Sequence, residues 1–112
     1  MTNSYPKCGD VYWIDLDPTT GSETKKRRPC LILSNDVYNK YSSRVIAAPI
    51  TSQLKSIYPC EMIIDVSGRP GKVMLDQIRS FDKSRLKGKL CMLEDLVMEQ
   101  VGVIFKNLFD FI

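Results

Sequence analysis

The sequence contains no histidine, and its four cysteines form no Cys-x-x-Cys pair. The absence of histidine excludes Ser-His-Asp and Cys-His catalysis, and also a pair of histidines acting as acid and base. A structural zinc site would have to collect four thiolates from distant segments, so we expect reduced, mostly buried thiols instead. These thiols belong to Cys8, Cys30, Cys60 and Cys91.

Long hydrophobic runs are also missing. No apolar stretch approaches the length that spans a membrane, and residues 1–7 lack the apolar region of a signal peptide, so we expect a cytoplasmic protein. A length of 112 residues with 44% apolar content predicts one folded domain over residues 1–112. The formal net charge is only +3, so the clustering of charge is more informative than its sum.

The densest cluster of charge is a run of four cations, Lys25 to Arg28, followed by Pro29. It ends a predicted loop, residues 17–27, between two segments with strand patterns, residues 10–16 and 30–34. Arginine presents a planar fork of donors to phosphate oxygens and stays charged at working pH. Arg28 alone is also compatible with a surface cation beside a strand, but Pro29 fixes φ and makes the strand entrance rigid.

The rest of the chain predicts further short strands and one terminal helix. A turn over residues 67–71 should join two antiparallel strands, and Asp82 should cap a short helical turn over residues 82–86. The further strands are predicted at residues 44–50, 60–66, 72–78 and 89–93.

The final segment has helical periodicity, with Glu94 and Asp95 at its start, where anions suit the helix dipole. Its apolar face comprises Val97, Val101, Ile104, Phe105 and Leu108. The predicted fold class is α+β and mostly β. We expect a small curved antiparallel sheet or partly open SH3-like barrel, with short helices and a C-terminal amphipathic helix.

Two polar groups follow predicted strands. Thr51 and Ser52 come after the strand 44–50, where hydroxyl groups often satisfy backbone atoms of a turn; Thr51 approaches Arg28 only if their strands are neighbours. Gln77, Arg79 and Ser80 end another strand and suit either base edges and phosphates or a charged edge strand.

Six segments together form an ordered set of motifs. They are Gly9-Asp10-Val11-Tyr12-Trp13-Ile14-Asp15-Leu16-Asp17-Pro18, Gly21-Ser22-Glu23, Arg28-Pro29, Ser34-Asn35-Asp36, Ala48-Pro49-Ile50-Thr51-Ser52 and the run from Leu75 to Leu86. In this order and spacing the chain resembles the MazF/PemK family of toxins, the ribonuclease halves of bacterial type II toxin–antitoxin pairs. Each segment alone is a weak signal, whereas the ordered set is specific.

The resemblance implies a homodimeric endoribonuclease that cleaves single-stranded messenger RNA at short sequences without a metal or other cofactor. It implies 2′,3′-cyclic phosphate and 5′-hydroxyl ends, inhibition of translation and growth, and an antitoxin whose acidic disordered segment blocks the groove. By motif position, Arg28 and Thr51 match the catalytic residues of the family. The implied RNA-binding residues are Asp17, Thr19, Thr20, Ser22, Glu23, Lys25, Lys26, Arg27, Asn35, Ser52, Gln77, Arg79 and Ser80.

The chain departs from the family in its basic loop, where Thr24, Lys25 and Lys26 follow Gly-Ser-Glu in place of Gln-Gly. The resemblance therefore leaves the cleavage sequence open. Two other interpretations remain: a basic β-barrel that binds nucleic acid without cutting it, and a gyrase-poisoning toxin of the same fold. The second predicts a Trp-Gly pair near the C-terminus, but the only tryptophan is Trp13.

Overall fold

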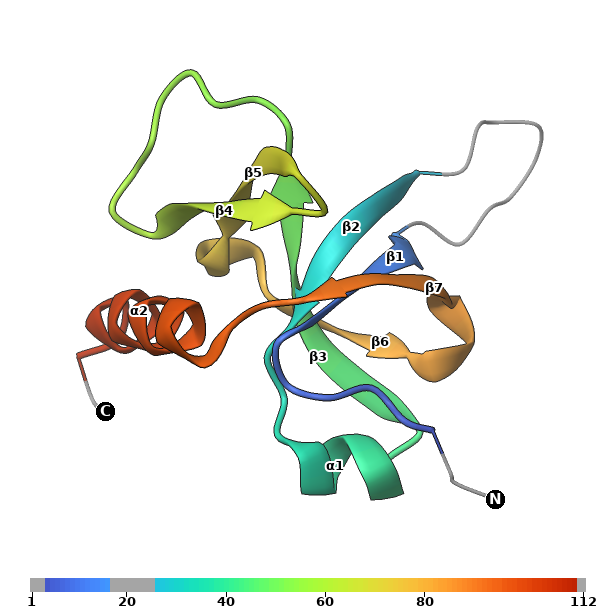
Figure 1. The fold of residues 1–112 in the computed structure, drawn as a ribbon. Helices are drawn as coiled ribbons and strands as arrows, with labels where there is room; N and C mark the ends of the chain where they lie inside the picture. The colour runs from blue at the N-terminus through green and yellow to red at the C-terminus, as the bar shows by residue number, and fades with distance from the viewer. Residues whose placement is uncertain (1–3, 17–25, 111–112) are drawn as a thin grey trace.

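The computed structural model describes residues 4–16 and 26–110, which form a curled sheet with helices on it (Figure 1). The strands among these residues are β1 (Asp10–Asp15), β2 (Arg27–Ile32), β3 (Arg44–Thr51), β4 (Glu61–Val66), β5 (Arg69–Met74), β6 (Arg79–Asp82) and β7 (Leu86–Met92). The α-helices are α1 (Asp36–Tyr41) and α2 (Asp95–Asn107), and two single 3₁₀ turns are η1 (Leu75–Gln77) and η2 (Lys83–Arg85).

Strand β3 organises the sheet, whose order is β4-β5-β3-β2-β1-β7 with β6 also paired to β3. All pairs are antiparallel. Along one edge β3 pairs with β2, whereas along its other edge β6 covers its first half and β5 its end. This branching curls the sheet into a partly open barrel, which confirms the predicted fold class (Figure 1).

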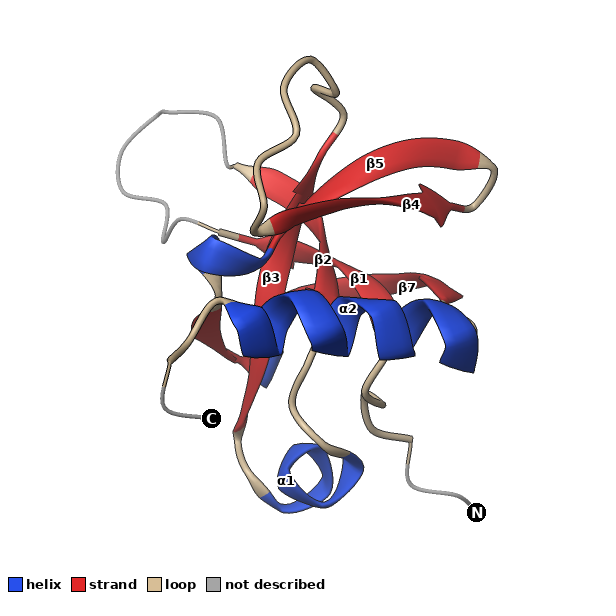
Figure 2. Cartoon of the chain, turned by 90° about the vertical axis from the view of Figure 1, so that its left-hand side faces the viewer, coloured by secondary structure: helices blue, strands red, loops and turns tan. Residues whose placement is uncertain are grey.

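Side chains alternate across each strand, so the two faces of the sheet carry separate apolar clusters. The first cluster lies against α2, which runs across this side of the sheet (Figure 2). It includes Val11, Leu31, Ala48, Val73 and Val101. The second cluster, on the other face, is formed by Ile14, Cys30, Ile32, Val45, Ala47 and Phe81.

Helix α2 confirms most of the predicted apolar face. Val101 is buried in the first cluster, and Val97, Ile104 and Phe105 pack against it. Leu108 was wrongly included, because α2 ends at Asn107 and the exposed Leu108 is its C-cap. No helix among the described residues is long and apolar enough to span a membrane.

Strand β2 begins at Arg27, three residues before the predicted start. The early start arises because β2 continues its ladder with β1, pairing Arg27 with Asp15, Arg28 with Ile14 and Pro29 with Trp13. Arg28 is therefore part of a strand inside a sheet, and its main chain is fixed by the neighbouring strand.

The hairpin β4–β5 is tighter than the sequence indicated. Its turn contains only Ser67 (φ 52°) and Gly68 (φ 89°), and positive φ at both central residues matches the twist of a two-residue hairpin. The remaining residues of the predicted turn belong to β5. Gly71 lies inside β5, where a Cβ would be only 2.6 Å from the Ile50 side chain. This close approach explains why the residue is a glycine.

The predicted strand 72–78 is wrong in its second half. The chain leaves β5 after Met74, makes the turn η1 and then pairs with the first half of β3 as β6. The predicted strand 89–93 starts earlier, at Leu86, because β7 pairs with β1. Asp82 makes no side-chain capping bond to η2; its carboxylate pairs with the Arg44 guanidinium at 3.1 Å.

The sequence analysis missed helix α1. Asn35 starts it, since its side chain accepts a hydrogen bond from the Tyr38 N–H at 2.8 Å. The buried Asn39 then binds back to the Ser34 hydroxyl and carbonyl. An asparagine followed by an acidic residue is a helix-start signal that the sequence offers at this position.

Candidate active site

The fold brings Arg28 and Thr51 to adjacent strand ends. Cys30 pairs with Pro49 and Leu31 with Ala48, so Arg28 and Thr51 lie just beyond the last pair, at neighbouring ends of β2 and β3. Side chains alternate along a strand, so Arg28 projects to the same side as Cys30, and Thr51 to the same side as Pro49. The two predicted catalytic residues, 23 positions apart in the sequence, thus come to neighbouring strand ends.

Both residues line a cleft of 710 Å³ between the ends of β2 and β3 and the β4–β5 hairpin. The cleft has an apolar floor and a cationic rim. The floor includes Trp13, Pro29, Ile50, Val66 and Leu90, and the rim carries Lys26, Arg27, Arg28 and Arg69. A cleft of this composition suits a polyanion that also presents flat apolar rings, as RNA does.

Thr51 is oriented by the loop that follows it. Its Oγ1 accepts a hydrogen bond from the Gln53 N–H at 3.1 Å. A hydroxyl can accept one hydrogen bond and donate another at the same time, so its proton can still donate to a second group. Among the described residues the structure gives that proton no acceptor, so it can donate to a substrate oxygen in the cleft.

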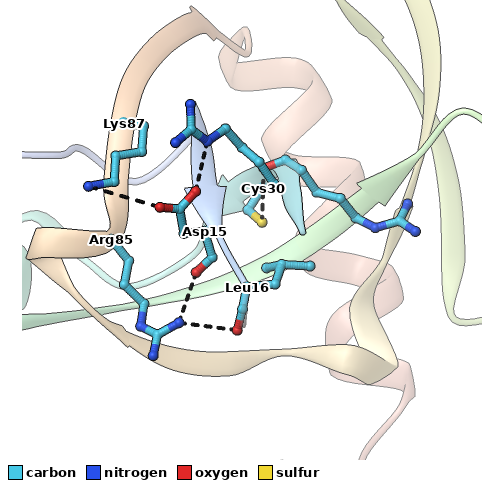
Figure 3. A network of polar contacts seen from close by, with 7 residues as sticks. Asp15, Leu16, Cys30, Arg85 and Lys87 are labelled. Atoms are coloured by element: carbon cyan, nitrogen blue, oxygen red, sulfur yellow. Dashed lines mark hydrogen bonds and ion pairs between the residues drawn. The ribbon is translucent and has the colours of Figure 1, made fainter. Parts of the chain in front are cut away.

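Arg27 and Arg28 are neighbours with different surroundings. Arg27 Nε lies 2.7 Å from Asp15 Oδ1, and Lys87 Nζ lies 4.0 Å from the other carboxylate oxygen (Figure 3). The half-buried Arg28 makes no ion pair or side-chain hydrogen bond with another described residue. Asp15 therefore offsets the charge of Arg27, whereas no described residue offsets the charge of the Arg28 guanidinium.

Two further arginines bind the strand end that precedes residues 17–25. Arg85 Nη1 donates to the carbonyl oxygens of Asp15 at 3.1 Å and Leu16 at 3.2 Å (Figure 3). Arg79 Nη2 donates to the Leu16 carbonyl at 3.1 Å, and the Leu16 N–H binds the Lys26 carbonyl at 2.8 Å. The strand ends that flank residues 17–25 are thereby tied to β6 and η2.

The thiol beneath Arg28 is structural. Cys30 is fully buried, and its Sγ donates to the Arg28 carbonyl at 3.7 Å (Figure 3). Burial raises the pKa of this thiol to about 12, against the smaller opposing effect of Arg28 and Arg79. Cys30 is therefore no nucleophile at neutral pH. The expectation of mostly buried thiols is wrong for the others, since Cys8 is exposed and Cys60 and Cys91 are partly exposed.

The other predicted RNA-binding residues divide into three groups. Ser52, Lys26 and Arg27 line the cleft together with Arg28 and Thr51, the predicted catalytic pair. Asn35, Gln77, Arg79 and Ser80 are not among its lining residues: Asn35 caps α1, Gln77 Nε2 contacts the Met74 sulfur at 3.5 Å, and Ser80 Oγ accepts from Arg44 Nε at 2.7 Å. Asp17, Thr19, Thr20, Ser22, Glu23 and Lys25 lie outside the described residues.

Sequence reasoning missed Arg69 and Trp13 as cleft residues. Arg69 was assigned to a turn, but it opens β5 and reaches the rim of the cleft through the β4–β5 hairpin. Trp13 was noted only as a strand residue, and it pairs with Pro29 next to Arg28. A basic residue beside a strong turn signal was the available clue to Arg69.

A cluster of metal-ligand types lies outside the cleft lining. The Sγ of Cys60 and carboxylate oxygens of Glu61 and Asp76 lie within 4.8 Å of one another. The Lys72 ammonium is already 3.2 Å from Glu61 Oε1. The Tyr58 N–H above all, and then Lys72, lower the pKa of Glu61 against the opposing effect of burial. Within this cluster the Glu61 carboxylate is therefore already paired with the ammonium of Lys72.

Comparison with known proteins places this site in a family. A family model described as the PemK-like, MazF-like toxin of type II toxin-antitoxin systems matches residues 7–109. The chain is 41% identical over 100 residues to Endoribonuclease EndoA of Bacillus subtilis (strain 168), covering 85% of this chain and 86% of that protein. It is 44% identical over 99 residues to Endoribonuclease MazF of Staphylococcus saprophyticus, covering 84% and 82%.

Solved structures agree with the sequence relatives. A MazE–MazF structure from Deinococcus radiodurans superposes with a TM-score of 0.82 at 31% identity, covering 98% of this chain and 100% of that chain. MazF alone from the same organism gives a TM-score of 0.78 at 32% identity, covering 95% and 97%. The chain therefore belongs to the PemK-like, MazF-like toxins of type II toxin–antitoxin systems.

Proposed function

We propose that this chain is the toxin of a type II toxin–antitoxin pair and cleaves single-stranded RNA at short sequences. The observation that carries the proposal is that Arg28 and Thr51 line the same cationic cleft. The endoribonuclease names of the relatives, at 41% and 44% identity, support the same activity. Cleavage of messenger RNA in the cytoplasm would inhibit translation and growth.

The proposed reaction uses a nucleophile that RNA supplies. The ribose 2′-hydroxyl attacks the adjacent phosphorus and loses its proton, the bond from phosphorus to the 5′ oxygen breaks, and the leaving oxygen gains a proton. The products are a 2′,3′-cyclic phosphate and a 5′-hydroxyl end. The protein has to align this attack and stabilise the additional negative charge on phosphorus.

Arg28 and Thr51 fit these two tasks. The Arg28 guanidinium can bind the non-bridging phosphate oxygens in a bidentate manner, which favours the more highly charged transition state. The Thr51 hydroxyl can donate to the same group or position the 2′-hydroxyl. A guanidinium with a pKa above about 12 is a poor base, so the role of Arg28 is electrostatic first. This chemistry requires no metal, because the substrate carries the nucleophile and Arg28 the positive charge.

The proposal includes two protein partners. One is a second copy of the chain, and the other is an antitoxin whose acidic, disordered segment orders on the cationic cleft in place of RNA. Antitoxin complexes are found among the structural relatives. Large apolar side chains exposed on β7 and α2, namely Met92, Leu96 and Val103, provide surface for protein contacts. The family match over residues 7–109 supports one toxin domain over 1–112.

One experiment separates this proposal from its two alternatives. Purified protein is incubated with a long messenger RNA transcript in EDTA, and the ends of all products are mapped. We expect cuts at one short recurring sequence, each leaving a cyclic phosphate and a 5′-hydroxyl end. Binding without cuts would favour the nucleic-acid-binding barrel, and gyrase inhibition with intact RNA would favour the poison. Activity that vanishes in EDTA and returns with magnesium would refute the proposed mechanism.

The cationic rim predicts the salt dependence of RNA binding. Each phosphate contact on single-stranded RNA contributes about 0.7 to the slope of log K against log salt. Lys26 has no ion-pair partner among the described residues, so Lys26→Gln should flatten the slope by about this amount. Arg27→Gln should change it less, because Asp15 already offsets that charge at 2.7 Å.

Fluorescence anisotropy of a labelled RNA between low and physiological salt measures these slopes. Lys106→Gln, in the last turn of α2, is the control and should leave the slope unchanged. A Lys26→Gln variant that keeps its affinity but cuts at a different sequence would make this residue a reader of bases instead.

A further inference from the structure

The loop of residues 52–60 connects Thr51 with β4 and extends away from the sheet (Figure 1). Seven of its nine residues are exposed, including Ile57 and Tyr58. A loop with so little buried surface needs specific anchors to keep one conformation. Two charged side chains from the neighbouring hairpin supply such anchors.

Lys72 of β5 is the first anchor. Its side chain is only 8% exposed, although lysine is rarely buried, and its Nζ donates to the Ser56 carbonyl at 2.6 Å. Glu61 of β4 is the second, with its side chain 9% exposed; its Oε1 accepts from the Tyr58 N–H at 3.0 Å. The Lys72 Nζ and Glu61 Oε1 are 3.2 Å apart, so the two anchors form one buried ion pair.

This ion pair lies on the face of the sheet that carries Thr51. Lys72 is the β5 residue directly paired with Thr51, and directly paired residues project to the same side. Ser56, whose carbonyl Lys72 binds, is therefore held on this side of the sheet. At the start of the loop the Gln53 N–H binds Thr51 Oγ1, so the path of the loop fixes the direction of the catalytic hydroxyl.

We infer that Lys72 and Glu61 are positioning residues: their buried ion pair holds loop 52–60 so that Gln53 orients the Thr51 hydroxyl toward the scissile phosphate. The inference rests on the proposed function, since it requires Thr51 to act in catalysis. Neither residue lines the cleft, so the pair acts on the reaction through the loop and not through contact with RNA.

The simplest competing explanation is that the pair only stabilises the fold. A buried ion pair is weak evidence for stabilisation, because desolvation of both charges offsets much of their attraction. Removing one partner alone leaves a buried charge uncompensated, which would confuse the two explanations. The informative variant is therefore Lys72→Met combined with Glu61→Gln, which leaves no buried charge and removes the bond to Ser56.

The test measures single-turnover cleavage of an RNA oligonucleotide that contains the mapped cut sequence. We expect the double variant to be slower by about 10-fold to 100-fold, the range produced by small misplacements of reacting groups. Its affinity for the same oligonucleotide with a 2′-deoxyribose at the cut should stay within about twofold. The contacts that bind the ground state and the transition state equally are unchanged in this variant. Trypsin should also cut the double variant faster after the exposed Lys55.

Two controls separate positioning from stability. Arg44→Ala, which removes the exposed ion pair with Asp82 at the far end of β3, should cleave at nearly the wild-type rate. Val101→Ala, on the buried face of α2, should lower Tm without slowing cleavage at 25 °C. Wild-type cleavage by the double variant, or an equal loss in Val101→Ala at a matched Tm, would overturn the inference.

Gln53 provides a second test that leaves the core intact. Gln53→Pro removes the N–H that binds Thr51 Oγ1, whereas Gln53→Ala retains it. We expect Gln53→Pro to be slowed and Gln53→Ala to match wild type; equal rates in both would contradict the inference. If the wild-type protein leaves RNA intact, the proposed function itself fails. If Thr51→Val cleaves like wild type, the role of Thr51 and this inference fail while the cleavage activity stands.

Discussion

Arg28→Ala should lose nearly all cleavage activity while the protein remains folded. Losing one preorganised donor at an oxyanion typically costs about 10²–10³ in rate, and Arg28 offers several donors with a full charge. The side chain is half-buried at the end of β2 and makes no ion pair with the described residues, so its removal breaks no structural bridge. Single-turnover cleavage of the mapped oligonucleotide, together with Tm, measures both effects.

Two further variants test whether this loss is specific to the Arg28 guanidinium. Arg28→Lys keeps the charge but loses the planar fork, so it should restore only a small part of the rate. Arg44→Ala removes an arginine from the opposite end of β3, where it forms an exposed pair with Asp82, and should leave cleavage unchanged. An Arg28→Ala protein that cuts at the wild-type rate would show that the site has been assigned to the wrong residue.

The early strands and the last helix could be predicted because their signals are local. Alternation in β1 and the apolar face of α2 each lie within a dozen residues, and both elements were found near their observed bounds. The starts of β2 and β7 were missed because pairing with β1 extends both strands beyond their apolar cores. The break between β5 and β6 depends on β3 changing partners along its length, which no local pattern records.

In the candidate site, too, some features have a local sequence signal and others depend on tertiary structure. Arg28 and Thr51 were named from motifs whose order resembles a known family, but only the antiparallel pairing of β2 with β3 brings both to one cleft. Lys72 and Glu61 left no signal, because a lysine and a glutamate in short strands normally indicate an exposed edge. Their burial follows from contacts with the loop of residues 52–60, and these contacts depend on tertiary structure.

Thr51→Val should reduce cleavage by about 10²–10³, the effect of losing one positioned donor. Valine has nearly the same shape and β-branching, so β3 and its pairing with Lys72 should be preserved. The substitution removes only the hydroxyl, which accepts a hydrogen bond from the Gln53 N–H and can donate to the phosphate. The rate of the chemical step should fall while the affinity for the 2′-deoxy oligonucleotide stays near that of wild type.

Thr51→Ser is the matched control, because it keeps both the acceptor for the Gln53 N–H and the donor for the phosphate. Serine lacks the methyl group that restricts χ1, so its hydroxyl samples more rotamers and the rate should fall between wild type and valine. The order threonine, serine, valine in rate, at equal affinity, is the expected signature of an oriented donor. Equal rates for valine and threonine would remove Thr51 from the mechanism and leave Arg28 as the only assigned catalytic group.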